Sequence, residues 1–264
     1  MLRERVLTTI IGLPIVIIAI WFGSPWFSLI IIIAALLGIR EFYRLASLSN
    51  AHPFIAIGMI WALLLMAASY CPWPHTTSAI MTIGIGFSLL WLLTKSSVSN
   101  AFNDWVWTVG GVLYIGWMAT YWILLRNLES GMLWTFWGLF TVFASDIGSF
   151  LIGRKQGKHP LAPVISPKKT WEGAFGGFFC SIVISIFFSL LFSLPLDWWQ
   201  VGIFAACISI LAQTGDLVES LLKRNTHVKD AGNLLPGHGG ILDRFDSLVL
   251  NGAFIYYVII FVIH

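Results

Sequence analysis

The sequence predicts an all-α, polytopic integral membrane protein, a helical bundle with about nine transmembrane helices. Of its 264 residues, 58% are hydrophobic and only 10% are charged, whereas soluble domains are typically about 25% charged. The mean hydropathy is +0.86. Apolar runs recur along the whole chain, and an α-helix needs roughly 17–25 such residues to cross a bilayer. The runs cover residues 6–22, 26–43, 53–70, 77–94, 105–125, 131–152, 172–194, 198–218 and 243–263.

The second run and the basic side chains refine this topology. Trp26 to Ile39 is only 14 residues long, so the second helix must extend through Arg40 and Glu41 to span the membrane. With nine spans and a cytoplasmic N-terminus, 14 of the 15 Lys and Arg residues fall on the cytoplasmic side, and Arg126 lies opposite. Because cytoplasmic loops carry an excess of basic residues, we expect the N-terminus inside and the C-terminus outside.

The remaining global features indicate one membrane domain. The first apolar run has a basic start but no small-residue cleavage site after it, so we expect a retained helix. Cys71, Cys180 and Cys207 have no paired spacing, which argues against a disulfide framework or a thiolate metal site. Neither an internal repeat nor a long linker divides the chain. We therefore expect a single transmembrane domain over residues 1–264.

Charged residues are concentrated near the C-terminus, between Ser220 and Asp246. These 27 residues contain Lys223, Arg224, Lys229, Asp230, His238, Asp243, Arg244 and Asp246. Acids that can hold a cation, bases that can hold phosphate and a glycine-rich turn are the parts that phosphoryl or nucleotidyl transfer needs.

Helical spacing places the acids of this region on defined faces. Gln213, Asp216, Ser220 and Lys223 recur at i, i+3, i+7 and i+10, with Glu219 alongside, and form one polar stripe. Asp243 and Asp246 are i and i+3 at the start of the last helix, so both carboxylates project from one face. Oxygen ligands of this kind suit Mg²⁺. The alternative is that Asp243 and Asp246 are acids favoured by the helix dipole.

Asp146 lies inside the sixth apolar run. A carboxylate at hydrocarbon depth costs a few kcal/mol, so it usually faces a partner or a water-filled cavity. The alternative is an acid near the interface that pairs with a lysine of a loop.

The segment 153–171 supplies basic groups for an anion. The run from Gly153 to Lys158 lacks the spacing of a Walker motif. Ser166 and Pro167 suit the N-cap and first position of a helix. We therefore expect a helix N-terminus beside Lys168 and Lys169, which would bind an anion.

Two glycine motifs have separate roles. Gly173 and Gly177 form a G-x-x-x-G pattern, which predicts a close helix contact. In the turn from Pro236 to Gly240, glycines allow positive φ and close backbone approach to a ligand. His238 in this turn could donate to a phosphate oxygen or a leaving group.

Ser220 to Asp246 reads S-x-L-K-R-x-x-x-x-K-D-x-G-x-x-L-P-x-H-G-G-I-x-D-R-F-D. This order resembles the signature of the phosphatidate cytidylyltransferase (CDP-diacylglycerol synthase) family, and every position of the pattern is met. Residues 166–173, S-P-K-K-T-W-E-G, resemble the second motif of the family. Ala144-Ser145-Asp146 followed by Gly153-Arg154 resembles its acidic helix end, although Ile147 replaces the more usual small hydroxyl residue. The resemblance also covers the multi-span layout of the family, with Glu41 near the end of the second helix.

The resemblance implies an integral membrane enzyme that converts CTP and phosphatidate to CDP-diacylglycerol and diphosphate with Mg²⁺. A second, monovalent cation such as K⁺ is left open. The metal-site acids of the family map onto Asp216 and Asp243. The family fold implies a homodimer with a polar funnel open to the cytoplasm and to lipid. We expect helices of residues 1–125 to form a lipid-facing and dimer scaffold, and residues 140–250 to form the catalytic portion.

The resemblance further implies a multi-pass protein of the inner cell membrane. Its expected partners are CTP, phosphatidate and membrane lipid, and no nucleic acid. The expected site residues fall into two groups. The catalytic residues are Asp216, Asp243, Asp246, Lys223, Arg224, His238 and Arg244. The substrate-binding residues are Ser166, Lys168, Lys169, Thr170, Lys229, Asp230, Gly239, Gly240 and Asp146.

Three other classes of membrane protein share some of these features. A CTP-dependent kinase of a lipid alcohol, such as a polyprenol or phytol, would need a base to activate the alcohol. A secondary transporter would be expected to show an internal repeat and broken helices near the midplane. A CDP-alcohol phosphotransferase would carry the order D-G-x-x-A-R…G-x-x-x-D-x-x-x-D, which this sequence lacks.

Overall fold

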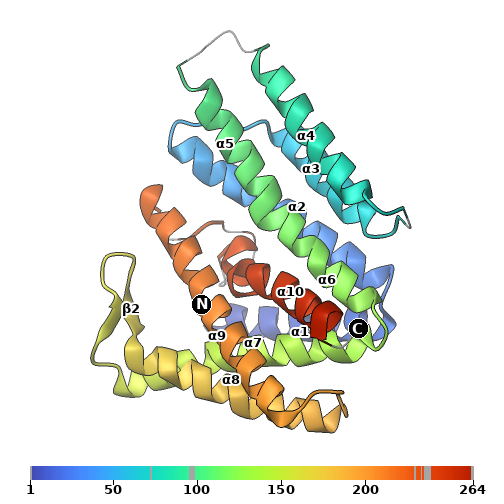
Figure 1. Ribbon diagram of the computed structural model, residues 1–264. Coiled ribbons are helices and arrows are strands. Elements are labelled where there is room, and N and C mark those ends of the chain that lie inside the picture. Colours follow the sequence, from blue (N-terminus) through green and yellow to red (C-terminus); the bar gives the residue numbers. More distant parts are fainter. Residues whose placement is uncertain are drawn as a thin grey trace. The chain divides into compact units, whose positions relative to one another are not determined.

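The computed structural model describes residues 2–71, 73–94, 99–228, 230–232, 234 and 239–262, and the side chains of these residues except 2–9 and 11. The described residues are mainly helical, which confirms the predicted all-α class. The helices are α1 (Leu2–Phe22), α2 (Trp26–Leu48), α3 (Ile55–Ala68), α4 (Thr76–Leu92), α5 (Ala101–Gly111), the π-helical turn η1 (Val112–Trp117), α6 (Met118–Asn127), α7 (Gly131–Gln156), α8 (Trp171–Leu191), α9 (Trp198–Asn225) and α10 (Leu242–Val262) (Figure 1). Since α5, η1 and α6 are continuous, each predicted apolar run corresponds to one helical segment.

Six helical segments in the described part of the chain are long and apolar enough to cross a membrane. They are Trp26–Leu48, Ala101–Asn127, Gly131–Gln156, Trp171–Leu191, Trp198–Asn225 and Leu242–Val262. Three more apolar helices are shorter, at Gly12–Phe22, Ile55–Ala68 and Thr76–Leu92. Large apolar side chains are exposed on these helices, including Leu190 at 75% and Phe261 at 78%. In water such surface would be unfavourable, so the chain is a multi-pass membrane protein.

The second helix extends well beyond the apolar run from which it was predicted. It continues through Arg40 and Glu41 to Leu48, as a membrane span requires. By contrast, α3 is shorter than its predicted run of 53–70. It starts after Pro53 and stops before a turn at Ser69 and Tyr70, where backbone N–H groups donate to carbonyls three residues back.

The chain forms two compact units, each made of two stretches of sequence. The first contains the chain up to Leu124 together with Asn225–Asp243. The second contains Leu125–Arg224 together with the chain from Arg244 onward.

Buried polar groups fix the link between α2 and α3 in the first unit. The hydroxyl of Tyr43 donates to the backbone oxygen of Thr108 at 2.8 Å. The hydroxyl of Thr108 accepts the N–H of Phe54 at 2.8 Å, and a carboxylate oxygen of Asp104 accepts the N–H of His52 at 2.6 Å. Backbone N–H groups of the link thus find partners on α5, and the bond from Phe54 to Thr108 is buried, as buried polar groups require partners.

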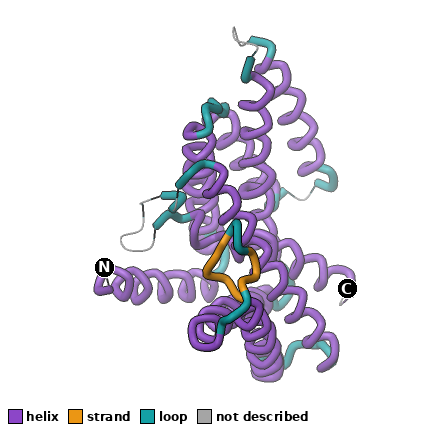
Figure 2. Tube along the Cα trace, turned by 90° about the vertical axis from the view of Figure 1, so that its left-hand side faces the viewer, coloured by secondary structure: helices purple, strands orange, loops and turns teal. Residues whose placement is uncertain are grey.

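In the second unit, α7 and α8 lie antiparallel in close contact (Figures 1 and 2). Gly173, Gly176 and Gly177 of α8 face α7. A Cβ atom at Gly173 would lie 2.8 Å from the backbone oxygen of Ser149, and one at Gly177 would lie 2.6 Å from that of Ser145. Glycine therefore permits this separation of the two helices, which confirms the predicted G-x-x-x-G contact.

The connection from α7 to α8 corrects the predicted helix start at Ser166. Residues 166–170 form strand β2 (Ser166–Thr170), which pairs antiparallel with β1 (Pro160–Ala162). Helix α8 begins after Thr170, whose hydroxyl accepts the N–H of Gly173 at 3.2 Å. The N-cap is therefore Thr170, because the extended backbone of 166–170 pairs with β1 before the helix begins. Figure 2 shows this hairpin as the orange segment.

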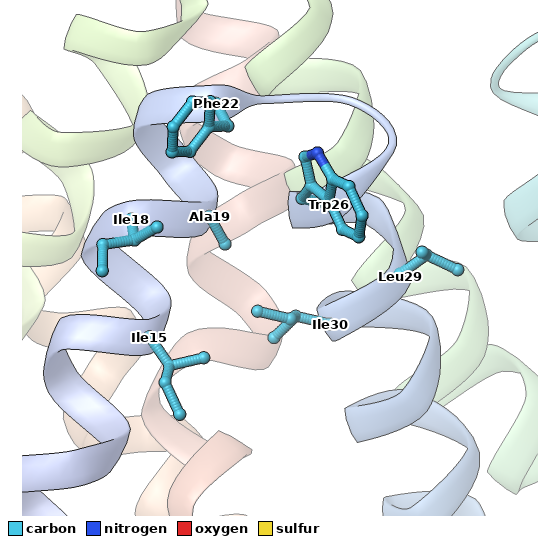
Figure 3. Close-up of a pocket in the computed structure, with 7 residues that line it drawn as sticks. All are labelled: Ile15, Ile18, Ala19, Phe22, Trp26, Leu29 and Ile30. Atoms are coloured by element: carbon cyan, nitrogen blue, oxygen red, sulfur yellow. The ribbon is translucent and has the colours of Figure 1, made fainter.

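An apolar pocket of about 580 Å³ lies between α1 and α2 (Figure 3). Its lining consists of Ile15, Ile18, Ala19, Phe22, Trp26, Leu29 and Ile30. These side chains suit hydrocarbon and offer no charged group for a phosphate or a cation. The pocket is thus unsuited to the polar chemistry expected of this chain.

The substitution Gly177→Ala should lower thermal stability. The added methyl group must displace the backbone of α7, and overpacking of this kind costs about 1–3 kcal/mol. Thermal unfolding in detergent should show a lower midpoint for this variant. Gly202→Ala in α9 is the control, since a Cβ atom there meets nothing within 4 Å. Equal midpoints for the two variants would contradict the close α7–α8 packing.

Candidate active site

Three carboxylates converge in the second unit. One oxygen from each of Asp216, Glu219 and Asp246 lies within 4.8 Å of the others. Glu219 is fully buried and Asp246 is 8% exposed. Asp216 of the predicted polar stripe and its neighbour Glu219, both on α9, thus lie together with Asp246 of α10. Oxygen donors at this separation can hold a hard divalent cation.

Gly215 allows α10 to approach α9 at this point. A Cβ atom on Gly215 would overlap the backbone oxygen of Asp246 and would lie 3.2 Å from its carbonyl carbon. Any other residue would push the first turns of α10 away from α9. The meeting of Asp246 with Asp216 and Glu219 therefore depends on a glycine one position before Asp216.

Two lysines pair with these acids. The Nζ atom of Lys169, from β2, lies 2.7 Å from an Asp216 carboxylate oxygen. The Nζ atom of Lys223 lies 2.7 Å from Oε2 of Glu219, one turn away on α9. Buried like charges repel one another strongly, and nearby ammonium groups reduce that cost. The same ammonium groups are suited to contact phosphate oxygens.

Ser247 links Asp146 to this group. Its hydroxyl donates to Oδ2 of Asp146 at 2.9 Å and lies 3.2 Å from Oδ1 of Asp246. Its backbone N–H also donates to Oδ1 of Asp246 at 2.7 Å. Ser247 is thus a hydrogen-bond partner of Asp146. Sequence reasoning missed Ser247, although its position beside Asp246 in the charged segment was a signal.

The two lysines of β2, Lys168 and Lys169, lie in different surroundings. Lys169 contacts Asp216, whereas Lys168 and Arg224 are exposed. The Nε atom of Arg224 donates to the backbone oxygen of Ile165 in the turn between β1 and β2 at 3.3 Å. Ser166 is half-buried in β2, and Thr170 acts as the N-cap of α8. The structure therefore brings Lys169, rather than a helix N-terminus at Ser166, to the acids.

Glu172 orders the start of this connection. Its carboxylate accepts the backbone N–H groups of Lys158 and His159 at 3.1 and 3.2 Å. The Nδ1 atom of His159 lies 2.6 Å from Oε1 of Glu172. The backbone of Trp171 also donates to the oxygen of His159 at 2.9 Å. These contacts tie the residues just after α7 to the start of α8, on either side of the hairpin that carries Lys169.

Asp243 organises the segment that precedes α10 in the first unit. Its Oδ2 atom accepts the N–H of Gly240 at 2.8 Å and that of Ala231 at 3.0 Å. Gly239 has φ of 83°, and a Cβ atom there would lie 2.8 Å from the same oxygen. A positive φ and this close approach explain the glycine. Asp243 lies in the first turn of α10, and both N–H groups that it accepts belong to residues that precede this helix.

Of the other predicted residues in the charged segment, two are described by the structure and two are not. Asp230 and Arg244 are exposed. Lys229 and His238 lie outside the described residues.

Together, these features define a multi-pass membrane protein with a buried acidic centre flanked by lysines, a suitable place for cation and phosphate chemistry. The model of the cytidylyltransferase family matches residues 3–262. The chain therefore belongs to the cytidylyltransferase family.

Curated relatives carry the name phosphatidate cytidylyltransferase. The protein from Bacillus subtilis is 33% identical over 98% of this chain and 97% of its own length. That from Staphylococcus epidermidis is 34% identical over 94% and 95%, respectively. The relative from Synechocystis is 28% identical over 97% of this chain and 96% of its own length. The similarity spans essentially the whole chain in each case.

Gly215→Ala should disable the acidic centre. The methyl group must displace Asp246 from Asp216 and Glu219, and misplacement by about 1 Å can cost about 10²-fold in rate. We expect nucleotide transfer to fall by about that factor. Thr214→Ala, at the exposed neighbouring position, is the control and should retain activity. Full activity of Gly215→Ala would show that the observed α9–α10 separation is unnecessary.

Proposed function

We propose that this protein is a phosphatidate cytidylyltransferase. An oxygen of the phosphatidate phosphate attacks the α-phosphorus of CTP and forms a new P–O bond. The bond between the α-phosphorus and its bridging oxygen breaks, and diphosphate leaves, which yields CDP-diacylglycerol. The observation that carries the proposal is the convergence of Asp216, Glu219 and Asp246, flanked by Lys169 and Lys223, in a chain of the cytidylyltransferase family.

The proposed nucleophile defines what the site must supply. A phosphate monoester carries about 1.5–2 negative charges near neutral pH, so it is already ionised and needs no general base. The obstacle is the repulsion between this anion and the triphosphate. The site must therefore neutralise negative charge and align the two substrates in line.

The carboxylates fit a divalent cation, which we propose to be Mg²⁺. All the donors are oxygen atoms, as hard cations prefer, and the burial of Glu219 and Asp246 would favour a bound positive charge. Asp216 and Asp246 would hold it with Glu219 adjoining, and the family resemblance adds Asp243. When bound, such a cation neutralises phosphate charge and orients the leaving diphosphate. Through Ser247, Asp146 would orient Asp246.

Basic side chains would hold the phosphates of the two substrates. Lys169 and Lys223 lie against the acids, and Lys168, Arg224 and Arg244 are exposed and so accessible to CTP. Preorganised positive groups of this kind stabilise the charge that develops on the leaving diphosphate. Lys229 and His238 are proposed for the same task from the sequence alone.

The distribution of basic residues supports a proposal for the membrane orientation. We propose that the N-terminus and the acidic centre face the cytoplasm, where the positive-inside bias puts 14 of the 15 Lys and Arg residues. From the family resemblance, we also propose that the protein acts as a homodimer in the cell membrane. The acyl chains of phosphatidate would stay in the bilayer while its head group reaches the acids.

Purified protein in detergent–lipid micelles should convert labelled CTP and phosphatidate to CDP-diacylglycerol and diphosphate. Formation of both products should require both substrates and Mg²⁺, and EDTA should abolish it because the acids alone cannot neutralise phosphate charge. Chromatography of the lipid and nucleotide products measures the reaction. Transfer of phosphate from CTP to a lipid alcohol would favour the kinase instead. An absence of nucleotide chemistry would favour the transporter.

Asp216→Asn and Asp243→Asn should each lower turnover by about 10²-fold or more, since each removes a charge proposed to hold the cation. The side-chain shape is kept, so both variants should insert and fold. Asp197→Asn, at an exposed position between α8 and α9, is the matched control. Near-normal turnover of either purified variant would rule out the metal assignment for that residue.

A further inference from the structure

We propose that Glu41 of α2 is a positioning residue for the reaction, because it holds the backbone that orients Asp243. The inference rests on the proposed function and adds a residue that lies 201 positions before its contact in the sequence. Glu41 is 9% exposed, although it lies within a membrane-spanning helix. Buried carboxylates in such helices are costly, which points to a specific role.

The carboxylate of Glu41 caps the start of α10. Its Oε2 atom accepts the N–H of Leu242, the first residue of that helix, at 2.9 Å. The first N–H groups of a helix have no partner within the helix, and they favour a negative charge. Glu41 therefore supplies from α2 the cap that a side chain just before the helix would ordinarily provide.

Two glycines enclose the same carboxylate. A Cβ atom on Gly232 would lie 2.5 Å from Cδ of Glu41, and one on Gly240 would lie 2.7 Å from it. The Cβ position of Gly240 is also 2.7 Å from the backbone nitrogen of Gly232. Both ends of the segment 232–240 thus close on Glu41, and a side chain at either glycine would prevent this.

The backbone held by Glu41 is also the backbone that holds Asp243. Gly240 lies against Glu41 and donates its N–H to Asp243, while Ala231, next to Gly232, donates a second N–H to the same carboxylate. Leu242, the residue bonded to Glu41, directly precedes Asp243. Loss of Glu41 would release these groups together and leave Asp243 less well oriented.

Among the described residues, the printed hydrogen bond makes Glu41 an acceptor for a backbone N–H group. A glutamine has the same length, and its amide oxygen can accept the N–H of Leu242. A metal ligand or a proton carrier would instead require the carboxylate charge. The pair Glu41→Gln and Glu41→Ala therefore distinguishes positioning from direct participation.

The test compares Glu41→Ala, Glu41→Gln and Glu129→Ala in detergent–lipid micelles with CTP, phosphatidate and Mg²⁺. Glu129 is exposed between α6 and α7 and serves as the control. We expect kcat per folded molecule to fall about 10–100-fold in Glu41→Ala, with a small change in the KM for CTP. In Glu41→Gln, kcat should lie within about threefold of the wild-type value, because the hydrogen bond to Leu242 is retained. The control should match the wild type.

Hydrogen exchange of peptides covering residues 239–246 provides a readout independent of turnover. Exchange should be faster in Glu41→Ala than in the wild type, and Glu41→Gln should restore protection. This readout tests the positioning role even if the wild type forms no CDP-diacylglycerol, an outcome that overturns the proposed function alone.

Three results would overturn the positioning role. The first is equal inactivity of the Gln and Ala variants, which would assign Glu41 to direct participation. The second is unchanged kcat per folded molecule in Glu41→Ala. The third is unchanged exchange in residues 239–246.

Discussion

The contact between α9 and α10 at Gly215 is the constraint on which the acidic centre depends. Only without a side chain at this position can the backbone of Asp246 lie where it does. The distance between the helices then brings Asp246 to the carboxylates of Asp216 and Glu219. Backbone packing, rather than attraction between the side chains, thus assembles three groups that repel one another.

Such a group of acids must be supported by its surroundings. Lys169 and Lys223 each lie 2.7 Å from a carboxylate oxygen, and Ser247 donates hydrogen bonds to Asp246 and Asp146. These contacts reduce repulsion and satisfy buried oxygen atoms, and both effects are needed where the dielectric constant is low. A protein designed only for stability would place apolar residues here. The acids are therefore best explained by chemistry with a cation and phosphates.

Glycine has a second role in the same chain. In α8, Gly173 and Gly177 allow close packing against α7, which holds the hairpin that carries Lys169. Before α10, Gly232 and Gly240 allow the backbone to close around the carboxylate of Glu41. In each case the absent side chain brings a charged residue to a defined place. The charged residues are recognisable as site candidates in the sequence, but their positions in the fold depend on these glycines.

Most of the fold follows from the sequence, because membrane spans are encoded locally. A bilayer requires long apolar helices with internal backbone hydrogen bonds, so hydropathy alone located every helical segment to within a few residues, apart from longer extensions of some ends. The spacing of Gln213, Asp216, Ser220 and Lys223 likewise located the polar stripe, because helical periodicity is a local property. The orientation, the dimer and the role of Asp243 as a metal ligand remain predictions.

Only the tertiary structure decided which distant groups meet. The hairpin at 160–170, the cap at Thr170, the bridge from Ser247 to Asp146 and the hydrogen bond from Leu242 to Glu41 were not predicted. Each depends on the separation and rotation of segments that are remote in sequence, or on strand pairing that competes with a helix. Periodicity identifies the face of a helix on which a side chain lies, but packing alone determines what that face contacts.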